Sequence, residues 1–256
     1  MTKPIQIKSL TIGEGIPKVC VPLTSSTWEA LCEEVRNAVR AGADLIEWRA
    51  DFYEDLMDIE KTSETLRNLS DILGQIPLLF TIRTKKEGGS CQISTLDYVN
   101  LNVAAANTGR ADLIDVEVFG NEAEKRELIH TLQHTGAKVI ASSHDFSKTD
   151  SRQVLLERFQ KMDATGADIL KMAVMPHEFD DVAALMQVTS TMGKEYTEKP
   201  LIAMSMGSMG SISRISGENF GSCITFGIVG AASAPGQFPV KELRMMLEAL
   251  HEKNQE

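Results

Sequence analysis

Short β-branched runs alternate with longer stretches of helical period along the chain, and the pattern repeats eight times. Apolar runs of this length are typical of buried strands, whereas apolar residues three and four apart indicate amphipathic helices. The pattern predicts strands at residues 18–23, 43–49, 77–84, 111–118, 137–143, 167–175, 200–206 and 223–229. It predicts helices at residues 27–41, 58–73, 94–108, 121–135, 150–165, 178–192, 209–217 and 239–253. Such alternation favours an α/β fold around a parallel sheet.

The junctions from helix to strand form a weak internal repeat. Four of them carry a glycine, at Gly42, Gly109, Gly136 and Gly166, where a left-handed helix cap costs little. A repeat without any Pro/Ser-rich linker predicts one (β/α)8 TIM barrel domain over residues 1–256, with an extra strand or plug at residues 5–12. An open doubly wound sheet is the alternative, although no G-x-G-x-x-G follows the first strand.

Composition narrows the partners and the compartment. The 256 residues are 43% hydrophobic and 24% charged, which is ordinary for a globular protein, and the net charge is -10. Nucleic acid and anionic membranes require a basic face, so neither is an expected partner. The four cysteines lack any C-x-x-C pair, which argues against a zinc site or a disulfide framework. With no signal-like apolar stretch near the N-terminus, we expect a cytoplasmic protein.

Ionisable residues gather at the predicted strand ends, where barrels of this kind carry their active sites. Glu47, Arg49 and Asp51 share one strand face, and we expect Glu47 and Arg49 to form a charged pair inside the barrel mouth. A purely structural ion pair is the alternative. Arg83 ends the third strand and is followed by a charged, glycine-rich loop that contains Glu87.

The next two strands add acidic and basic groups. Asp115 and Glu117 lie on one face of strand four. His144 is the one histidine of five at a strand end, which favours a role in proton transfer over a surface position. His130 and His134 are four apart on a helix and could share a metal, but the H-E-x-x-H pattern is absent and we expect a solvated helix face.

Lys171 lies inside the apolar strand that runs from residue 167 to 175. A lysine seldom occupies such a position without a reason. Desolvation disfavours the ammonium form and favours the free amine, which can attack a carbonyl carbon. The alternative is a lysine that reaches solvent or pairs with a carboxylate such as Glu117.

Two loops after the last strands carry further polar groups. Residues 206–214 are rich in glycine and serine and end in Arg214, whose guanidinium can hold a carboxylate or phosphate. Residues 231–237 form a small-residue loop with Ser233 and Gln237, typical of a flexible lid.

A desolvated lysine, a histidine, a glutamate and several arginines fit imine chemistry on a small carboxylated ketone. The sequence resembles the type I 3-dehydroquinate dehydratases over essentially the whole chain. The matching motifs are Glu47-Trp-Arg49-Ala-Asp51, Phe80-Thr-Ile-Arg83, Glu87-Gly-Gly, Asp115-Val-Glu-Val, Ser143-His144-Asp-Phe, Lys171-Met-Ala-Val-Met-Pro, Ser213-Arg214 and Ser233-Ala-Pro-Gly-Gln237.

The resemblance implies dehydration of 3-dehydroquinate to 3-dehydroshikimate in the shikimate pathway, which supplies chorismate and aromatic amino acids. Lys171 matches the lysine that forms a Schiff base, His144 the general acid/base, and Glu87 the carboxylate that orients that histidine. The resemblance assigns substrate binding to Glu47, Arg49, Arg83, Arg214, Ser233 and Gln237, with Arg214 as the carboxylate clamp. It also implies a homodimer, and an activity that needs no metal or other cofactor.

Two departures and two rival functions qualify this interpretation. Ser143 stands where the family commonly has asparagine, and Pro22 where some relatives have serine, so neither position is given a role. A class I aldolase also uses a barrel lysine, and the loop from residue 206 could bind phosphate. A barrel that binds a carbohydrate or acid without turnover is the rival from a different class.

Overall fold

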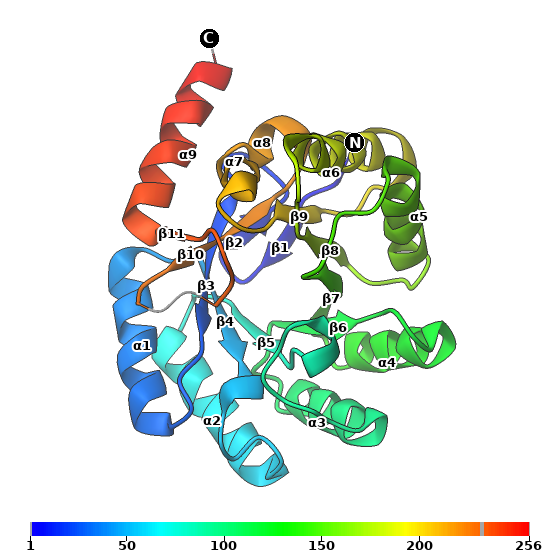
Figure 1. The fold of residues 1–256 in the computed structure, drawn as a ribbon. Helices are drawn as coiled ribbons and strands as arrows, with labels where there is room; N and C mark the ends of the chain where they lie inside the picture. Colours follow the sequence, from blue (N-terminus) through cyan, green and yellow to red (C-terminus); the bar gives the residue numbers. More distant parts are fainter. Residues whose placement is uncertain (1, 231–232, 256) are drawn as a thin grey trace.

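A computed structural model of the chain describes residues 2–230 and 233–255, apart from the side chain of Glu122. Nine parallel strands form one curled sheet, and the helices cover its outer side (Figure 1). Most strands that follow one another along the chain are neighbours in this sheet, because a helix leads the chain from the end of one strand to the start of the next. The predicted TIM-barrel α/β fold class is confirmed.

All eight predicted strands are present. The sheet consists of β3 (Lys18–Leu23), β4 (Leu45–Arg49), β5 (Leu78–Thr81), β6 (Leu113–Glu117), β7 (Lys138–Asp145), β8 (Ile169–Val174), β9 (Leu201–Ser205), β10 (Ile224–Ile228) and β11 (Phe238–Pro239). The longer helices are α1 (Trp28–Ala41), α2 (Ile59–Leu73), α3 (Thr95–Asn107), α4 (Glu122–His134), α5 (Arg152–Asp163), α6 (Phe179–Thr191) and α9 (Val240–Asn254). Short helical segments are η1 (Ala50–Phe52), η2 (Lys85–Glu87), η3 (Met192–Tyr196), η4 (Met209–Ser211), α7 (Ile212–Ile215) and α8 (Gly217–Phe220).

The predicted strand at residues 77–84 is too long, because β5 ends at Thr81. Beyond that point the backbone amides donate hydrogen bonds to side chains from neighbouring elements. The amide of Arg83 donates to Asp51 Oδ1 at 3.3 Å, and the amide of Thr84 donates to Glu117 Oε1 at 2.7 Å. The chain therefore leaves the sheet where the cleft begins.

The single helix predicted at residues 209–217 is wrong. The segment is divided into η4, α7 and α8, and the Ser213 hydroxyl binds the backbone of β9. The amide of Ser205 donates to Ser213 Oγ at 2.9 Å, and that hydroxyl donates to the Gly210 carbonyl at 2.7 Å. A side chain at position 210 would collide with the Ser205 carbonyl, so glycine permits this close return.

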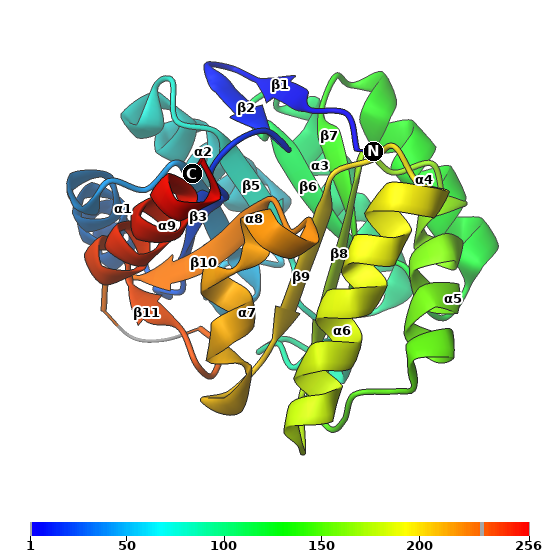
Figure 2. The same ribbon diagram turned by 90° about the horizontal axis from the view of Figure 1, so that it is seen from above.

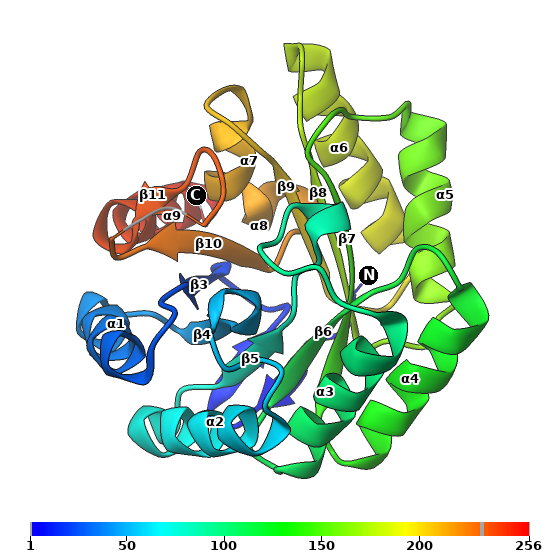
Figure 3. The same ribbon diagram turned by 60° about the horizontal axis from the view of Figure 1, so that its bottom comes forward.

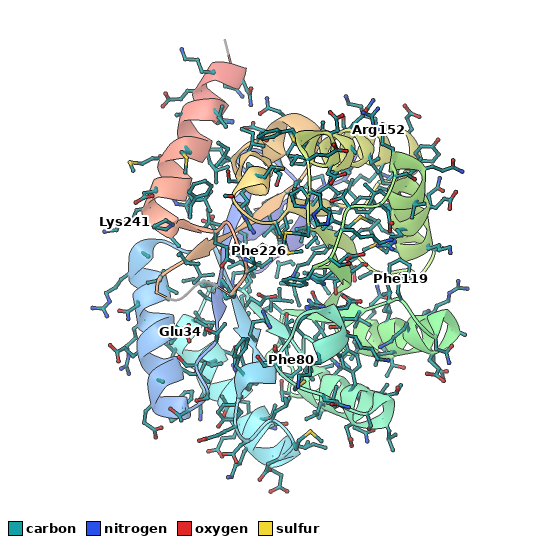
Figure 4. All side chains as sticks on the ribbon, viewed as in Figure 1. Glu34, Phe80, Phe119, Arg152, Phe226 and Lys241 are labelled. Carbon is teal, nitrogen blue, oxygen red and sulfur yellow. The ribbon has the colours of Figure 1, made fainter. Side chains whose placement is uncertain are left out.

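Side chains alternate between two apolar layers along each strand. Leu45 belongs to the layer inside the barrel, whereas Ile46 and Trp48 belong to the layer between strands and helices. The Trp48 ring packs edge-on against Phe80, with centroids 5.5 Å apart. Figure 4 shows Phe226 near the centre of the ring of strands. The predicted alternation, with Glu47 and Arg49 facing inward, is confirmed.

The repeated glycine-containing junctions have a structural role at the bottom of the barrel. Gly42, with φ of 88°, caps α1 in the left-handed conformation. Two residues later, Asp44 accepts a hydrogen bond from the amide of Val19 on the preceding strand at 2.8 Å. The aspartates at positions 112 and 168 do the same for the amides of residues 78 and 139. Three of the four junctions thus tie a loop to the start of the neighbouring strand.

A hairpin closes the bottom of the barrel. Residues 5–12, expected to form an extra strand or plug, consist of β1 (Ile5–Ile7) and β2 (Leu10–Ile12), paired antiparallel. Figure 2 shows this hairpin across one end of the barrel. Ile7 and Ile12 pack against the inner apolar layer. The opposite end, where the strands terminate, is therefore the open one.

The ring closes between β9 and β10 at their beginnings. The amide of Cys223 donates to the Leu201 carbonyl at 2.8 Å, and the amide of Ala203 donates to Ser222 Oγ at 2.9 Å. The Ser222 hydroxyl thus takes the place of a backbone carbonyl in the ladder. Further along, β9 and β10 diverge, and the loops that follow them border the cleft (Figure 3).

Candidate active site

One cleft at the carboxyl ends of the strands contains all the residues predicted for the site. It opens to solvent, and its empty space, counted together with the open mouth, is about 470 Å³. Apolar side chains of Phe146, Met204, Met206 and Phe226 form part of its wall. The predicted residues that line it are Glu47, Arg49, Arg83, Glu87, His144, Lys171, Arg214, Ser233 and Gln237.

Lys171 lies on β8 at the floor of this cleft and is 3% exposed. Its Nζ atom is 3.4 Å from Glu47 Oε1 and 3.3 Å from Asp115 Oδ2. The same nitrogen lies 4.6 Å from the centroid of the Phe226 ring. Burial disfavours the ammonium ion, whereas the carboxylates and the ring stabilise it. The carboxylate partner suggested by the strand pattern, Glu117, does not contact this lysine in the described structure.

Asp115 is a site residue that the sequence did not single out for a role, although alternation had placed it on the same strand face as Glu117. Its carboxylate accepts a hydrogen bond from Ser142 Oγ at 2.6 Å and forms an ion pair with Arg83 at 2.8 Å. Burial would raise the pKa of Asp115, but Arg83 and Lys171 together lower it below the ordinary value. The aspartate is therefore a fixed negative charge beside the lysine.

The expected ion pair between Glu47 and Arg49 is wrong. Arg49 instead makes a two-pronged contact with Asp51, at 2.7 Å and 2.8 Å. Glu47 accepts a hydrogen bond from Thr81 Oγ1 at 2.9 Å and faces Lys171. Residues two apart on a strand differ in height by about 6.6 Å, so the two side chains belong to different levels of the barrel.

His144 and Glu87 form a partly buried pair on one wall of the cleft. Glu87 Oε2 accepts a hydrogen bond from the backbone amide of His144 at 2.9 Å and lies 3.0 Å from its Nδ1. Figure 3 shows η2, which ends in Glu87, beside the end of β7. Because that oxygen is an acceptor, we assign the ring proton to Nδ1, which leaves Nε2 free to accept a proton.

Burial and nearby cations tune this pair. Burial lowers the pKa of His144 well below its ordinary value, and the positive charges of Arg83, Lys171 and Arg49 lower it further. Burial raises the pKa of Glu87 to about 8, against the opposing effect of Arg83. His144 is therefore a neutral imidazole at neutral pH, the form that can act as a base.

Arg214 is a buried guanidinium at the opposite side of the cleft. It is 1% exposed, and its contacts are the Pro235 carbonyl at 2.9 Å and Met204 Sδ at 3.9 Å. Its Nε atom has no hydrogen-bond partner, and no carboxylate of the described residues lies within ion-pair distance of it. Burial lowers the pKa of Arg214 to about 10, so it is still cationic at neutral pH. A buried cation without a counter-ion is suited to an anionic ligand.

Ser233 and Gln237 belong to the loop that follows β10. Gln237 Oε1 accepts hydrogen bonds from the amides of Ser233 and Ala234 at 2.9 Å and 3.2 Å. The Pro235 carbonyl also accepts from the amide of Gly207 at 3.2 Å, which ties this loop to the loop after β9. Residues 231 and 232 of the predicted lid lie outside the described residues.

Other predicted features can be placed as well. His134 Nδ1 lies 2.6 Å from the carbonyl of His130 on an exposed face of α4. Within the described ranges 2–230 and 233–255, no group of three or more His, Cys, Asp or Glu side chains is arranged so that it could hold a metal ion. Over the same ranges, no helix is both long and apolar enough to cross a bilayer. All four cysteines are free.

Comparison with known proteins identifies the family. The sequence model of the type I 3-dehydroquinase family matches residues 19–254. A 3-dehydroquinate dehydratase of Listeria welshimeri is 44% identical over 249 residues, which are 97% of this chain and 98% of that protein. One from Bacillus licheniformis is 43% identical over 251 residues, 98% of this chain and 99% of that protein.

A solved structure agrees with this assignment. The type I 3-dehydroquinate dehydratase of Clostridium difficile, solved with covalently modified comenic acid, superimposes with a TM-score of 0.95 at 43% identity. The match covers 99% of this chain and all of that one. This chain therefore belongs to the type I 3-dehydroquinase family.

Proposed function

We propose that this protein dehydrates 3-dehydroquinate to 3-dehydroshikimate, with Lys171 as the Schiff-base amine and His144 as the general acid and base. The observation that carries the proposal is the meeting of three groups in one cleft. These are the Lys171 amine, the His144 imidazole with its Glu87 partner, and the unpaired Arg214 guanidinium. The names of the relatives support the same activity.

The reaction begins with addition of the Lys171 nitrogen to the C3 carbonyl carbon. Loss of the carbonyl oxygen as water leaves a protonated imine, and its positive charge acidifies the C2 proton. The neutral imidazole of His144 removes that proton, which gives an enamine. The enamine electrons expel the C1 hydroxyl, which leaves as water with a proton from His144.

Hydrolysis completes the cycle. Water adds to the imine carbon, and cleavage of the carbon–nitrogen bond releases 3-dehydroshikimate and the free Lys171 amine. The water consumed here equals the water released when the imine formed, so the net reaction is loss of one water. Each step needs only side chains of this protein, the substrate and water, so the proposed mechanism uses no cofactor.

Substrate binding is proposed for the charged and polar groups around the amine. Arg214 would hold the substrate carboxylate, because it is the buried cation that lacks a carboxylate partner. Glu47, Arg49, Arg83, Ser233 and Gln237 would hold the ring hydroxyls and the carboxylate. These groups lie in the same cleft as Lys171 and present both donors and acceptors.

The biological setting is part of the proposal. The name of the relatives supports a place in the shikimate pathway, which leads to chorismate and the aromatic amino acids. A cytoplasmic location is supported by the cysteine pattern, and a homodimer by the family resemblance. No nucleic acid partner is proposed, since the net charge is -10.

Two measurements test the proposal. Turnover of 3-dehydroquinate should raise ultraviolet absorbance as a conjugated enone-carboxylate forms, and folded protein that gives no signal would rule out the dehydratase. Borohydride with substrate present should leave a reduced adduct that mass mapping locates on Lys171. Turnover without any adduct on Lys171 would exclude the covalent mechanism but keep the activity.

A further inference from the structure

One nitrogen of Arg83 lies between two carboxylates. The Nη1 atom is 3.1 Å from Glu117 Oε1 and 3.6 Å from Glu87 Oε2, and it donates to Ser142 Oγ at 3.0 Å. The Glu87 oxygen in this contact is the one that faces Nδ1 of His144. Arg83 is therefore shared between the histidine's partner and a second glutamate to which the proposed mechanism gives no role.

Glu117 is held firmly on the far side of Arg83. Thr84 donates to it twice at 2.7 Å, from its amide to Oε1 and from its hydroxyl to Oε2. The backbone amide of Glu117 donates to the Tyr98 hydroxyl at 3.1 Å. A carboxylate fixed in this way keeps a constant distance from the guanidinium.

The charge of Glu117 also acts on Glu87. Burial is the main reason that the pKa of Glu87 rises to about 8, and Arg83 opposes the rise. Glu117 and Asp115 reinforce it, because a second and third negative charge disfavour ionisation of Glu87. Glu117 therefore acts both directly, by repulsion, and indirectly, by occupying Arg83.

We propose that Glu117 is a positioning residue that sets how strongly Arg83 acts on Glu87, and through Glu87 governs the protonation of His144. The inference deepens the proposed function and rests on it for its kinetic part. It assigns Glu117 no contact with substrate.

Other charges around the two glutamates come from several elements and must stay constant in any test. Lys125 of α4 faces both carboxylates and lies 4.2 Å from the centroid of the Tyr98 ring. The titratable and charged groups that face the pair are Arg83, Cys91, Tyr98, Asp115, Lys125 and His144. Because substitution of Glu117 leaves all of these in place, its effect can be measured separately.

The test is the substitution Glu117→Gln, which removes the charge and keeps the shape. With one negative charge removed and Arg83 released, the pair of Glu87 and His144 should lose its proton at a pH lower by about 0.5–1 unit. The midpoint is measured by nitrogen NMR of the His144 ring in the ligand-free protein. In the plot of kcat against pH, the limb that reflects titration of Glu87 and His144 should move in the same direction.

Two further variants separate charge from support. Glu117→Asp restores the charge and should bring the midpoint back towards that of the parent. Thr84→Val removes one donor, so Glu117 should bind Arg83 more tightly and move the midpoint upward. That second shift keeps the proposal testable if Glu117→Gln does not fold.

The outcomes are distinct. An unchanged NMR midpoint in Glu117→Gln, with only a higher KM, would overturn the proposal and leave Glu117 as a mere anchor for Arg83. The ring titration needs no substrate. If the parent protein had no dehydratase activity, the proposed function would be contradicted. The ring titration would still show whether Glu117 is coupled to His144.

Discussion

Lys171 Nζ lies 3.3 Å from Asp115 Oδ2, and both residues are buried in the floor of the cleft. Asp115 is itself anchored by Ser142 and Arg83. The lysine is thus part of a charge network that includes Glu47 on the other side. Its removal changes the electrostatics of the whole floor as well as the chemistry.

Lys171→Met tests both consequences. Turnover should fall by more than about 10³-fold, because Lys171 is the one lysine among the described residues that line the cleft. Stability should fall by about 3–5 kcal/mol, since Glu47 and Asp115 lose their shared cation in a buried site. Thermal unfolding and the absorbance assay measure the two effects. Stability equal to or above that of the parent would show that the lysine destabilises the fold and does not serve as a counter-ion.

His144→Ala should slow proton transfer and leave the amine intact. We expect kcat to fall by about 10²–10⁴-fold, which is the usual contribution of a general acid/base. The imine should accumulate, because its formation is affected less than its onward reaction. Borohydride trapping followed by intact mass would detect it. Less adduct in the variant than in the parent, with kcat reduced, would place the role of His144 before imine formation.

Arg214→Met should separate binding from stability. KM should rise by about 10²-fold or more, because a charge-assisted contact with the substrate carboxylate is lost. The ligand-free protein should melt at a higher temperature, since a buried cation without a counter-ion is replaced by an apolar side chain. A matched control is Arg244→Met, which removes the partly buried partner of Asp44 and leaves the cleft intact. An unchanged KM in Arg214→Met would remove this residue from the binding site.

Glu87→Gln should change how stability depends on pH. The folded state raises the pKa of Glu87 from 4.5 to about 8, so it holds the proton more tightly than the unfolded chain does. This stabilisation is complete below about pH 4.5 and is lost as the pH rises through about 8. Relative to the parent, the variant should therefore gain stability between about pH 5 and pH 9. Urea unfolding of parent and variant at both pH values measures this change. If the difference in unfolding free energy between the two proteins were the same at both pH values, the raised pKa of Glu87 would be contradicted.

Local patterns in the sequence determined the barrel and the content of the cleft. Strand alternation puts every second side chain inside, so the sequence alone assigns Glu47, Arg49 and Lys171 to the inward face. The fold then places strand ends together, which predicts that these residues share a site with His144. The predicted ends of helices and strands were less accurate. The strand predicted to reach residue 84 ends at Thr81, because side chains from distant elements decide where the backbone leaves the sheet.

Only the tertiary structure decided which charged side chains form ion pairs with one another. Glu47 faces Lys171, 124 residues away, and not Arg49 on its own strand. Asp115 acquires its position beside the lysine from the stagger of β6 and β8. The course of two loops leaves Arg214 without a carboxylate partner among the described residues. Alternation is a property of one strand, whereas ion pairing depends on heights and distances across the barrel. Those distances exist only once the ring has closed.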